Sequence, residues 1–340
     1  MTFVLGVDGG ASKTIALVAT EGGEIVGSGR RAGSSIYEGE PRVMLANAID
    51  ACRDALAMAE ISEPDIAASV FSMSGADWPE DFALIESILA DHGLGQRITV
   101  VNDAIGGLRA GSATGPAVAV ICGTGAGSAA RNGAGTIWHS SFWQGGGGAV
   151  DLTNKTLRAV YRAELGIAPP TMLTSAVLAF TGFDGVNALL HHLTARDGVS
   201  STRYAGLARV LLDIASAGDP TARGIVAAFG AVLGEDAVVA AHQVGIETDP
   251  FELVLGGSVF KHPEPLLAES LVARVREACP SIAVIHNQFE PVVGALLLAF
   301  DEAANEPASG VAAAVETSWL HHRDSVLAIP VTGFARATSG

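Results

Sequence analysis

Two glycine-rich turns carry the residue types that can bind a phosphate group. The first turn is Asp8-Gly9-Gly10-Ala11-Ser12-Lys13-Thr14 and the second is Gly123-Thr124-Gly125-Ala126-Gly127-Ser128, and each follows a short apolar run. Glycine lets backbone N–H groups approach an anion closely, because it has no Cβ and accepts positive φ. Either turn alone could be an ordinary hairpin. Two such turns in the same context favour a paired phosphate site.

Asp8 stands beside the first turn, where its charge needs an explanation. A carboxylate that faces phosphate oxygens repels them unless a cation lies between the two. Mg²⁺ commonly fills this position and keeps several of its water ligands. We therefore expect Asp8 to hold Mg²⁺, through water, next to the phosphates.

Two further segments could complete a site. Gly256-Gly257-Ser258 follows an apolar run, where a glycine backbone can pass flat against a purine or ribose. A plain turn between a strand and a helix explains it equally well. Asp103 follows Asn102 at the start of a predicted helix, so it could be an N-cap or a general base that accepts a proton from a hydroxyl group.

The elements that must position these residues alternate between strand and helix patterns. Strands are expected at residues 3–7, 14–20, 24–29, 66–73, 98–101, 117–122, 128–131, 136–139, 251–255 and 282–285. Helices are expected at residues 41–59, 79–92, 104–110, 154–165, 206–217, 220–242 and 291–303, with a further helix directly after Ser258. Residues 325–331 could form an edge strand that Pro330 interrupts. The opening hairpin unit recurs at residue 117, which predicts two related halves with a cleft between them.

Composition narrows the class of protein. The 340 residues carry a formal net charge of −16, which disfavours a nucleic-acid-binding surface. They are 49% hydrophobic, which disfavours a disordered chain. We expect no membrane span and no leader segment, and hence a cytosolic protein. The three cysteines Cys52, Cys122 and Cys279 are widely spaced, which favours reduced structural thiols.

The order of these motifs resembles the sugar kinases and ATPases of the actin-like superfamily. It is most similar to the N-acetylglucosamine kinase family, which includes the BadF/BadG/BcrA/BcrD activator ATPases of benzoyl-CoA reductase and 2-hydroxyacyl-CoA dehydratase. The resemblance spans residues 3–304. It implies an α/β fold of two ribonuclease H-like domains of the actin/hexokinase type with an interdomain cleft. The first domain would be residues 1–115 completed by the helix at 291–304, the second would be residues 116–290, and the tail 305–340 stays unassigned.

The resemblance also implies roles for single residues. Asp8 to Thr14 would form the first phosphate loop, Gly123 to Ser128 the second, and Gly256, Gly257 and Ser258 the adenosine loop. Asp103 would be the catalytic base. The substrate side would comprise Ser34, Ser35, Gly75, Ala76, Asp77, Asn102, Gln144 and Gly145. Asp77 could instead cap the following helix, and Ser34 and Ser35 could be ordinary loop residues. ATP, Mg²⁺, a sugar substrate and a homodimer follow from the same likeness.

One segment departs from the family pattern. Its sugar kinases carry a glycine-aspartate-glutamate-glycine turn after the second phosphate loop, whereas residues 145–148 here are four glycines. Carboxylates accept charge-assisted hydrogen bonds from sugar hydroxyls, worth about 1.5 to 3 kcal/mol each. Gln144, His139 or Asp151 could replace them, or a bulkier sugar could use the space.

Three functions remain open from the sequence. The first is ATP-dependent phosphorylation of an amino sugar, most closely N-acetylglucosamine or glucosamine, with Asp103 as base. The second is an activator ATPase that shares a [4Fe–4S] cluster between subunits, which needs suitably placed cysteines. The third is a nucleotide- or sugar-binding regulator without turnover. We do not expect a DNA-binding repressor, because no helix-turn-helix pattern is seen before Phe3. The retained Asp103 favours the kinase over a regulator without turnover.

Overall fold

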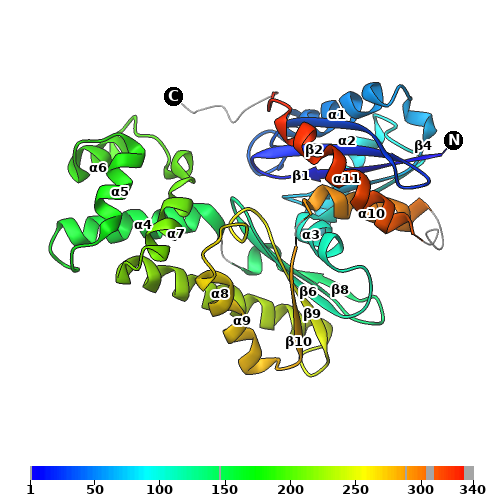
Figure 1. The fold of residues 1–340 in the computed structure, drawn as a ribbon. Helices are drawn as coiled ribbons and strands as arrows, with labels where there is room; N and C mark the ends of the chain where they lie inside the picture. Colours follow the sequence, from blue (N-terminus) through cyan, green and yellow to red (C-terminus); the bar gives the residue numbers. More distant parts are fainter. Residues whose placement is uncertain (1, 145–146, 288, 304–309, 333–340) are drawn as a thin grey trace. The chain divides into compact units, whose positions relative to one another are not determined.

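The computed structural model describes residues 2–144, 147–287, 289–303 and 310–332, which fall into two units. Unit 1 comprises Met1–Thr114 with Asn287–Ser339, and unit 2 is Gly115–His286. Each unit is built on one five-stranded mixed sheet covered by helices (Figure 1). The predicted α/β class is confirmed.

The sheet of unit 1 has the strand order β3-β2-β1-β4-β5. Its strands are β1 (Phe3–Gly9), β2 (Lys13–Thr20), β3 (Ile25–Ala32), β4 (Ile66–Met73) and β5 (Arg97–Asn102). β1, β2 and β3 form an antiparallel meander, whereas β1, β4 and β5 are parallel. Because parallel strands end at the same edge of a sheet, residues that follow β1, β4 and β5 are brought together there.

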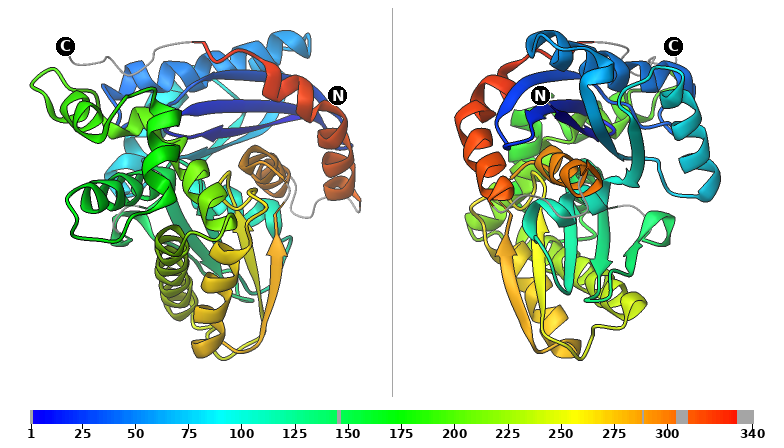
Figure 2. Two further views of the ribbon diagram at one scale, coloured as in Figure 1. Left: turned by 60° about the vertical axis from the view of Figure 1, so that its left-hand side comes forward. Right: turned by 90° about the vertical axis from the view of Figure 1, so that its right-hand side faces the viewer.

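Helices cover both faces of this sheet (Figure 2). One face packs against α1 (Pro41–Met58) and α2 (Pro79–Ala90) through Leu5 and Val7 of β1. The other face packs against α10 (Pro291–Ala303) and α11 (Val311–Ala328), which Val4 contacts, and α3 (Asp103–Gly111) lies against α10. The end of β1 is therefore buried between two helical layers.

Unit 2 repeats the same sheet order with its own strands. These are β6 (Ala117–Cys122), β7 (Ala126–Arg131), β8 (Ile137–His139), β9 (Phe251–Gly256) and β10 (Ile282–His286), in the order β10-β9-β6-β7-β8. The meander is again antiparallel, and β6, β9 and β10 are parallel. This repeat agrees with the recurring hairpin in the sequence.

Six α-helices accompany the sheet of unit 2. They are α4 (Gly148–Glu164), α5 (Met172–Thr181), α6 (Val186–Thr194), α7 (Leu207–Ser216), α8 (Pro220–Val244) and α9 (Leu266–Ala278). Sequence patterns missed α5, α6 and α9 and began α4 six residues too late. The helix expected directly after Ser258 is wrong, because α9 begins only at Leu266. Pro263 and Pro265 lie in the intervening turn, where they oppose helix formation.

The helix α8 is long and apolar enough to cross a membrane by length and composition. Its most apolar window has a mean hydropathy of 1.7 and is 44% buried, and α5 with α6 meets the same test only as a pair bent by 57°. Within unit 2, however, α8 packs on α9 and on β6, β7 and β8. This position is typical of the core helix of a globular domain.

The segment after residue 309 also differs from expectation. Residues 325–328 belong to α11, so the edge strand predicted at 325–331 is wrong; Thr332 alone makes a bridge to Arg31. The indole of Trp319 is fully buried in the core of unit 1. Arg30 also donates to the carbonyl oxygen of Ile329 at 2.8 Å. Burial of the apolar face of α11 in unit 1 outweighs the strand propensity of residues 325–331.

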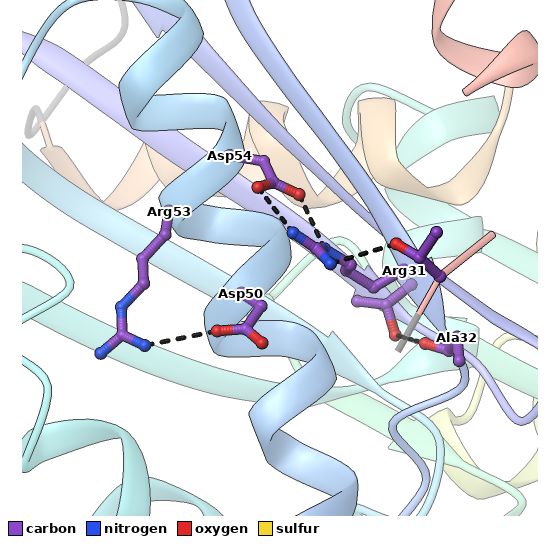
Figure 3. Close-up of polar contacts among 7 residues, drawn as sticks. Arg31, Ala32, Asp50, Arg53 and Asp54 are labelled. Atoms are coloured by element: carbon purple, nitrogen blue, oxygen red, sulfur yellow. Dashed lines mark hydrogen bonds and ion pairs between the residues drawn. The ribbon is translucent and has the colours of Figure 1, made fainter. Parts of the chain in front are cut away.

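An ion pair fixes the end of β3 to α1 (Figure 3). Arg31 donates from Nε and Nη2 to the two carboxylate oxygens of Asp54, each at 2.7 Å. Arg53 and Asp50 form a second pair along α1. Bidentate geometry makes the first pair directional, and it holds β3 in place just before Gly33 and Ser34.

The crossing of α10 over α3 yields a first prediction. A Cβ at Gly294 would overlap the carbonyl oxygen of Gly106 and lie 2.7 Å from the nitrogen of Ala110. Gly294→Ala should therefore lower the free energy of unfolding by about 1 to 3 kcal/mol, measured by urea denaturation. Gly224→Ala in α8 is the control, because no atom lies within 4 Å of its Cβ position; it should stabilise by about 0.5 to 1 kcal/mol. Equal effects of the two substitutions would contradict the packing argument.

Candidate functional site

The first glycine-rich turn is the tight connection between β1 and β2. The N–H of Gly10 donates to the carbonyl oxygen of Lys13 at 2.9 Å, and the N–H of Ser34 donates to Gly10 at 3.0 Å. A Cβ at Gly9 would lie 2.5 Å from Oγ of Ser34 and from the side chain of Met73. Glycine is thus required for the segment after β3 to lie against this loop.

Asp8 is a buried carboxylate at the end of β1, with 7% of its surface exposed. Among the described residues, no hydrogen bond to its side chain is found. Burial raises the pKa of Asp8 from 3.8 to about 7; the Lys13 ammonium opposes the rise, and Asp103 and Glu290 add to it. A bound cation would offset the cost of burying this charge.

The surroundings of Asp8 fit a magnesium ion that shares its ligands with a phosphate. Carboxylate oxygen is the ligand type that Mg²⁺ prefers, and the ion usually takes its remaining ligands from water and substrate phosphates. In the described part of the chain, no cluster of three or more His, Cys, Asp or Glu side chains could hold a metal by itself. A metal bound at Asp8 would take its remaining ligands from water and from a phosphate group.

Glu290 is a residue of this site that the sequence patterns missed. Its Oε2 lies 3.0 Å from Nζ of Lys13, and only 12% of its side chain is exposed. Glu290 directly precedes Pro291, the first residue of α10. The sequence signal that could have identified Glu290 is a carboxylate directly before an apolar helix. Its partner Lys13 lies near the other end of the chain, so the pair itself cannot be read from local patterns.

Asp103 is the first residue of α3, at the end of β5. The N-cap is Asn102, whose Oδ1 accepts from the N–H of Ala104 at 3.0 Å, so the capping interpretation of Asp103 is wrong. Burial raises the pKa of Asp103 to about 6, the charge of Asp77 adds to it, and N–H groups of the first helical turn oppose it. At neutral pH this carboxylate is mostly ionised and can accept a proton.

Asn102 joins Asp103 to the segment after β4. Its Nδ2 donates to Oδ1 of Asp77 at 3.0 Å and to the carbonyl oxygen of Ala76 at 3.2 Å. Gly75 has a φ of +93°. The alternative role of Asp77 as a helix cap is wrong, because Trp78 is the N-cap of α2 and Asp81 accepts from its N–H at 2.8 Å. Asp77 is thus directed toward Asn102.

Ser34 and Ser35 are both buried in unit 1. Thr14 Oγ1 lies 2.8 Å from Oγ of Ser34 and donates to the carbonyl oxygen of Ala32 at 2.8 Å. Ser34 therefore supports the first phosphate loop, and its contact with a sugar stays a prediction.

In unit 2 the second glycine-rich turn connects β6 and β7 and lies against the start of α4. The N–H of Ala149 donates to Gly123 at 2.8 Å, and that of Val150 donates to Thr124 at 3.2 Å. Gly148 has a φ of +78°, and a Cβ there would overlap the carbonyl oxygen of Gly125. A side chain at residue 148 is incompatible with this contact.

The predicted adenosine loop meets the second turn at the neighbouring strand ends. Gly257 has a φ of +95°, and a Cβ there would overlap the carbonyl oxygen of Cys122. The same oxygen accepts from the N–H of Val259 at 3.0 Å. Ser258 is exposed next to this contact. Unit 2 thus brings together Gly123, Thr124, Gly125, Gly256, Gly257 and Ser258.

The residues proposed to replace the missing acidic turn differ in their environment. The Nε2 of Gln144 is buried and has no hydrogen-bond partner in the part of the chain that the structure describes, so it can donate to a ligand. Trp143 beside it is 77% exposed. Asp151 lies 3.4 Å from Lys155, which offsets its charge. Gly145 lies outside the described residues.

The comparison with known proteins assigns the family. The model of the BadF/BadG/BcrA/BcrD ATPase family matches residues 5–299. The chain belongs to this family. The resemblance inferred from the motifs is thereby confirmed.

Proteins similar to this chain have names and structures that can be compared. The N-acetylmuramic acid/N-acetylglucosamine kinase of Clostridium acetobutylicum is 25% identical over 89% of this chain and 99% of its own. The N-acetyl-D-glucosamine kinase of Dictyostelium discoideum is 24% identical over 87% and 97%. The crystal structure of a candidate N-acetylglucosamine kinase from Chromobacterium violaceum superposes with a TM-score of 0.68 at 20% identity, covering 88% of this chain and 99% of that one. The actin/hexokinase-type fold is confirmed.

The burial of Asp8 predicts how the stability of this ATPase-family chain depends on pH. Its pKa is raised in the folded state, so folding favours the protonated form and stability falls as the pH rises from about 4 to about 7. Asp8→Asn should stabilise the nucleotide-free protein by up to about 4 kcal/mol at pH 8 and much less at pH 5, measured by urea denaturation. Asp91→Asn, at an exposed pair, is the control. Parallel pH profiles for wild type and Asp8→Asn would refute the prediction.

Proposed function

We propose that this protein is an ATP-dependent kinase that transfers the γ-phosphate to a hydroxyl group of an amino sugar, most closely N-acetylglucosamine or glucosamine. The observation that carries the proposal is Asp103, a half-buried carboxylate with a pKa of about 6 at the same sheet edge as Asp8 and the first glycine-rich loop. The kinase names of relatives that align along nearly their full length support it.

In the proposed reaction, Asp103 accepts the proton of the sugar hydroxyl as its oxygen attacks the γ-phosphorus. The bond between the γ-phosphorus and the β,γ-bridging oxygen breaks, and ADP leaves. The backbone N–H groups of the two phosphate loops bind the phosphates, and Gly256, Gly257 and Ser258 bind the adenosine. Mg²⁺ at Asp8, when bound, neutralises the charge of the phosphate oxygens.

The sugar side of the proposal depends chiefly on unit 1. Asp77 and Asn102 offer carboxylate and amide groups beside Asp103, and such groups bind sugar hydroxyls through directional hydrogen bonds. Gly75 and Ala76 would supply backbone groups, and Ser34 and Ser35 hydroxyl groups. Gln144 and Gly145 of unit 2 would complete the set, with Gln144 as an amide donor.

The environment of the cysteines bears on the activator alternative. All three thiols are buried, and burial raises the pKa of Cys122 to about 12 and also raises that of Cys52 and Cys279. A cluster shared between subunits needs thiolates that reach the subunit surface. The kinase is therefore favoured over the activator, and the retained Asp103 favours it over a regulator without turnover.

We further propose a soluble cytoplasmic homodimer that binds neither nucleic acid nor a membrane. The net charge of −16 argues against binding to nucleic acid, which is also negatively charged. The packing of α8 against its neighbours in unit 2 argues against its use as a membrane span.

The role of Asp103 can be tested directly. Asp103→Asn should reduce sugar-dependent ADP formation by about 10² to 10⁴, because general-base catalysis contributes that much. The affinity for MgATP, measured by calorimetry, should change little. Asp91→Asn is the control. A coupled assay over hexoses, hexosamines and their N-acetyl forms identifies the substrate; undiminished turnover of Asp103→Asn would refute its assignment, and no response to any sugar would refute the kinase.

The pH profile gives a second test of the same base. Since Asp103 must be ionised to accept a proton, kcat/KM should fall as the pH drops through about 6. The charge of Asp77 raises the pKa of Asp103, so Asp77→Asn, which keeps an acceptor for Asn102, should move this acidic limb to lower pH. A limb that stays in place or moves upward would contradict the assignment.

A further inference from the structure

Unit 2 contains a groove that the proposed function does not use. It lies between α4 and the first half of α8 and has a volume of about 490 Å³. This volume falls in the range of about 300 to 1,000 Å³ that is typical of sites for small molecules. The floor is apolar and comes from Ile225, Ala228, Phe229 and Val232 of α8.

One wall of the groove is a row of cations on α4. Lys155, Arg158 and Arg162 all line it, at the spacing of successive helical turns. Lys155 is paired with Asp151 at 3.4 Å. Among the described residues, the side chains of Arg158 and Arg162 have no ion-pair or hydrogen-bond partner. Arg162 also lies in the last turn of α4, where a cation interacts favourably with the negative end of the helix dipole. Arg158 lies further from the helix end and has no such role.

This arrangement is uncommon in a chain with 20 basic and 36 acidic residues. Two unpaired guanidinium groups above an apolar floor match a ligand with an anionic edge and an apolar body. Guanidinium binds carboxylate, sulfonate and phosphate groups through paired N–H donors. A sugar, which has hydroxyl groups on every side, would leave them unsatisfied over this floor.

The groove is separate from the glycine-rich loops, but its floor lies near the second of them. The opposite side of α8 faces α9, where a Cβ at Gly234 would lie 2.7 Å from the carbonyl oxygen of Leu271. On the groove side, Cζ of Phe229 lies 3.9 Å from the Cβ position of Gly147, and that position is 3.0 Å from Cβ of Ala126 in β7. The floor thus reaches the segment between the second phosphate loop and α4.

We propose that the groove between α4 and α8 is a binding site for a small amphipathic organic anion, held by Arg158 and Arg162 and coupled to the second phosphate loop through Phe229. The ligand class is an acyl or aryl body that carries a carboxylate, sulfonate or phosphate. The binding part of the proposal is independent of the kinase reaction, whereas the coupling rests on the proposed nucleotide role of the second loop.

Two fluorescent probes of similar shape test the binding. Anilinonaphthalene sulfonate carries an anionic group, and N-phenylnaphthylamine does not. The intact protein should bind one equivalent of each. The double variant Arg158→Gln with Arg162→Gln should weaken binding of the sulfonate about tenfold and leave binding of the neutral probe nearly unchanged. The reason is that two partly exposed charge interactions together change the Kd by about a factor of ten. Arg223→Gln, a cation on α8 outside the groove, is the control.

A filling substitution tests the location. Ala228→Trp should abolish binding of both probes, whereas Val239→Trp, at another exposed position of α8, should not. Binding that does not saturate, that persists in Ala228→Trp, or that is equally sensitive to Val239→Trp would overturn the site. A change of oligomeric state in Ala228→Trp, seen by sedimentation, would assign the groove to contacts between copies and would also overturn it.

The coupling is measured as a change in nucleotide affinity. Saturating sulfonate should shift the Kd of MgADP at least about fivefold, a typical coupling between sites, and the shift should vanish in Ala228→Trp. Equal affinities with and without the probe would overturn the coupling. Failure of MgADP to bind at all would instead count against the proposed function, since probe binding is measured without nucleotide.

Discussion

Unit 1 buries a carboxylate whose charge the nearby Lys13 ammonium offsets only in part. Asp8 lies at the end of the central strand β1, whose two faces are covered by α1 and α2 and by α10 and α11. The same packing that builds the core therefore desolvates Asp8 and raises its pKa to about 7. The fold thus keeps a group that is locally unfavourable in its charged form, and carboxylates with pKa values shifted this far are frequent at functional sites.

Glycines at strand ends determine how closely the surrounding segments approach in each unit. Gly9 lets the side chains of Ser34 and Met73 lie against the first loop, and Gly257 lets its turn lie against the end of β6. Gly148 does the same for α4 at the second loop. At Gly148 and Gly257 the close neighbours are backbone carbonyl groups, so these contacts are fixed before any ligand arrives. Preorganised N–H groups of this kind are effective anion ligands because they need no rearrangement on binding.

Local sequence patterns were sufficient for the sheets and for the position of the two glycine-rich turns, because alternating apolar runs and glycine turns are short-range signals. They failed where the structure depends on distant contacts. The pair between Lys13 and Glu290 joins residues 277 positions apart, and α11 forms because Trp319 is buried in unit 1. Sequence patterns also could not identify the N-cap of α3. Asn102 and Asp103 are both good capping residues, and only the backbone geometry shows that Asn102 is the cap.

The four-glycine turn can now be understood in physical terms at one of its positions. Gly148 has positive φ, and a Cβ there would overlap Gly125, so an acidic residue at 148 would push α4 away from the second phosphate loop. Gly148 corresponds to the last glycine of the glycine-aspartate-glutamate-glycine turn, so this constraint holds for that turn as well and does not by itself account for the missing acidic pair. Asp77 lies near enough to raise the pKa of Asp103, and Asn102 connects the segments that carry them. The carboxylates that the structure brings together therefore lie at the ends of β4 and β5, both in unit 1.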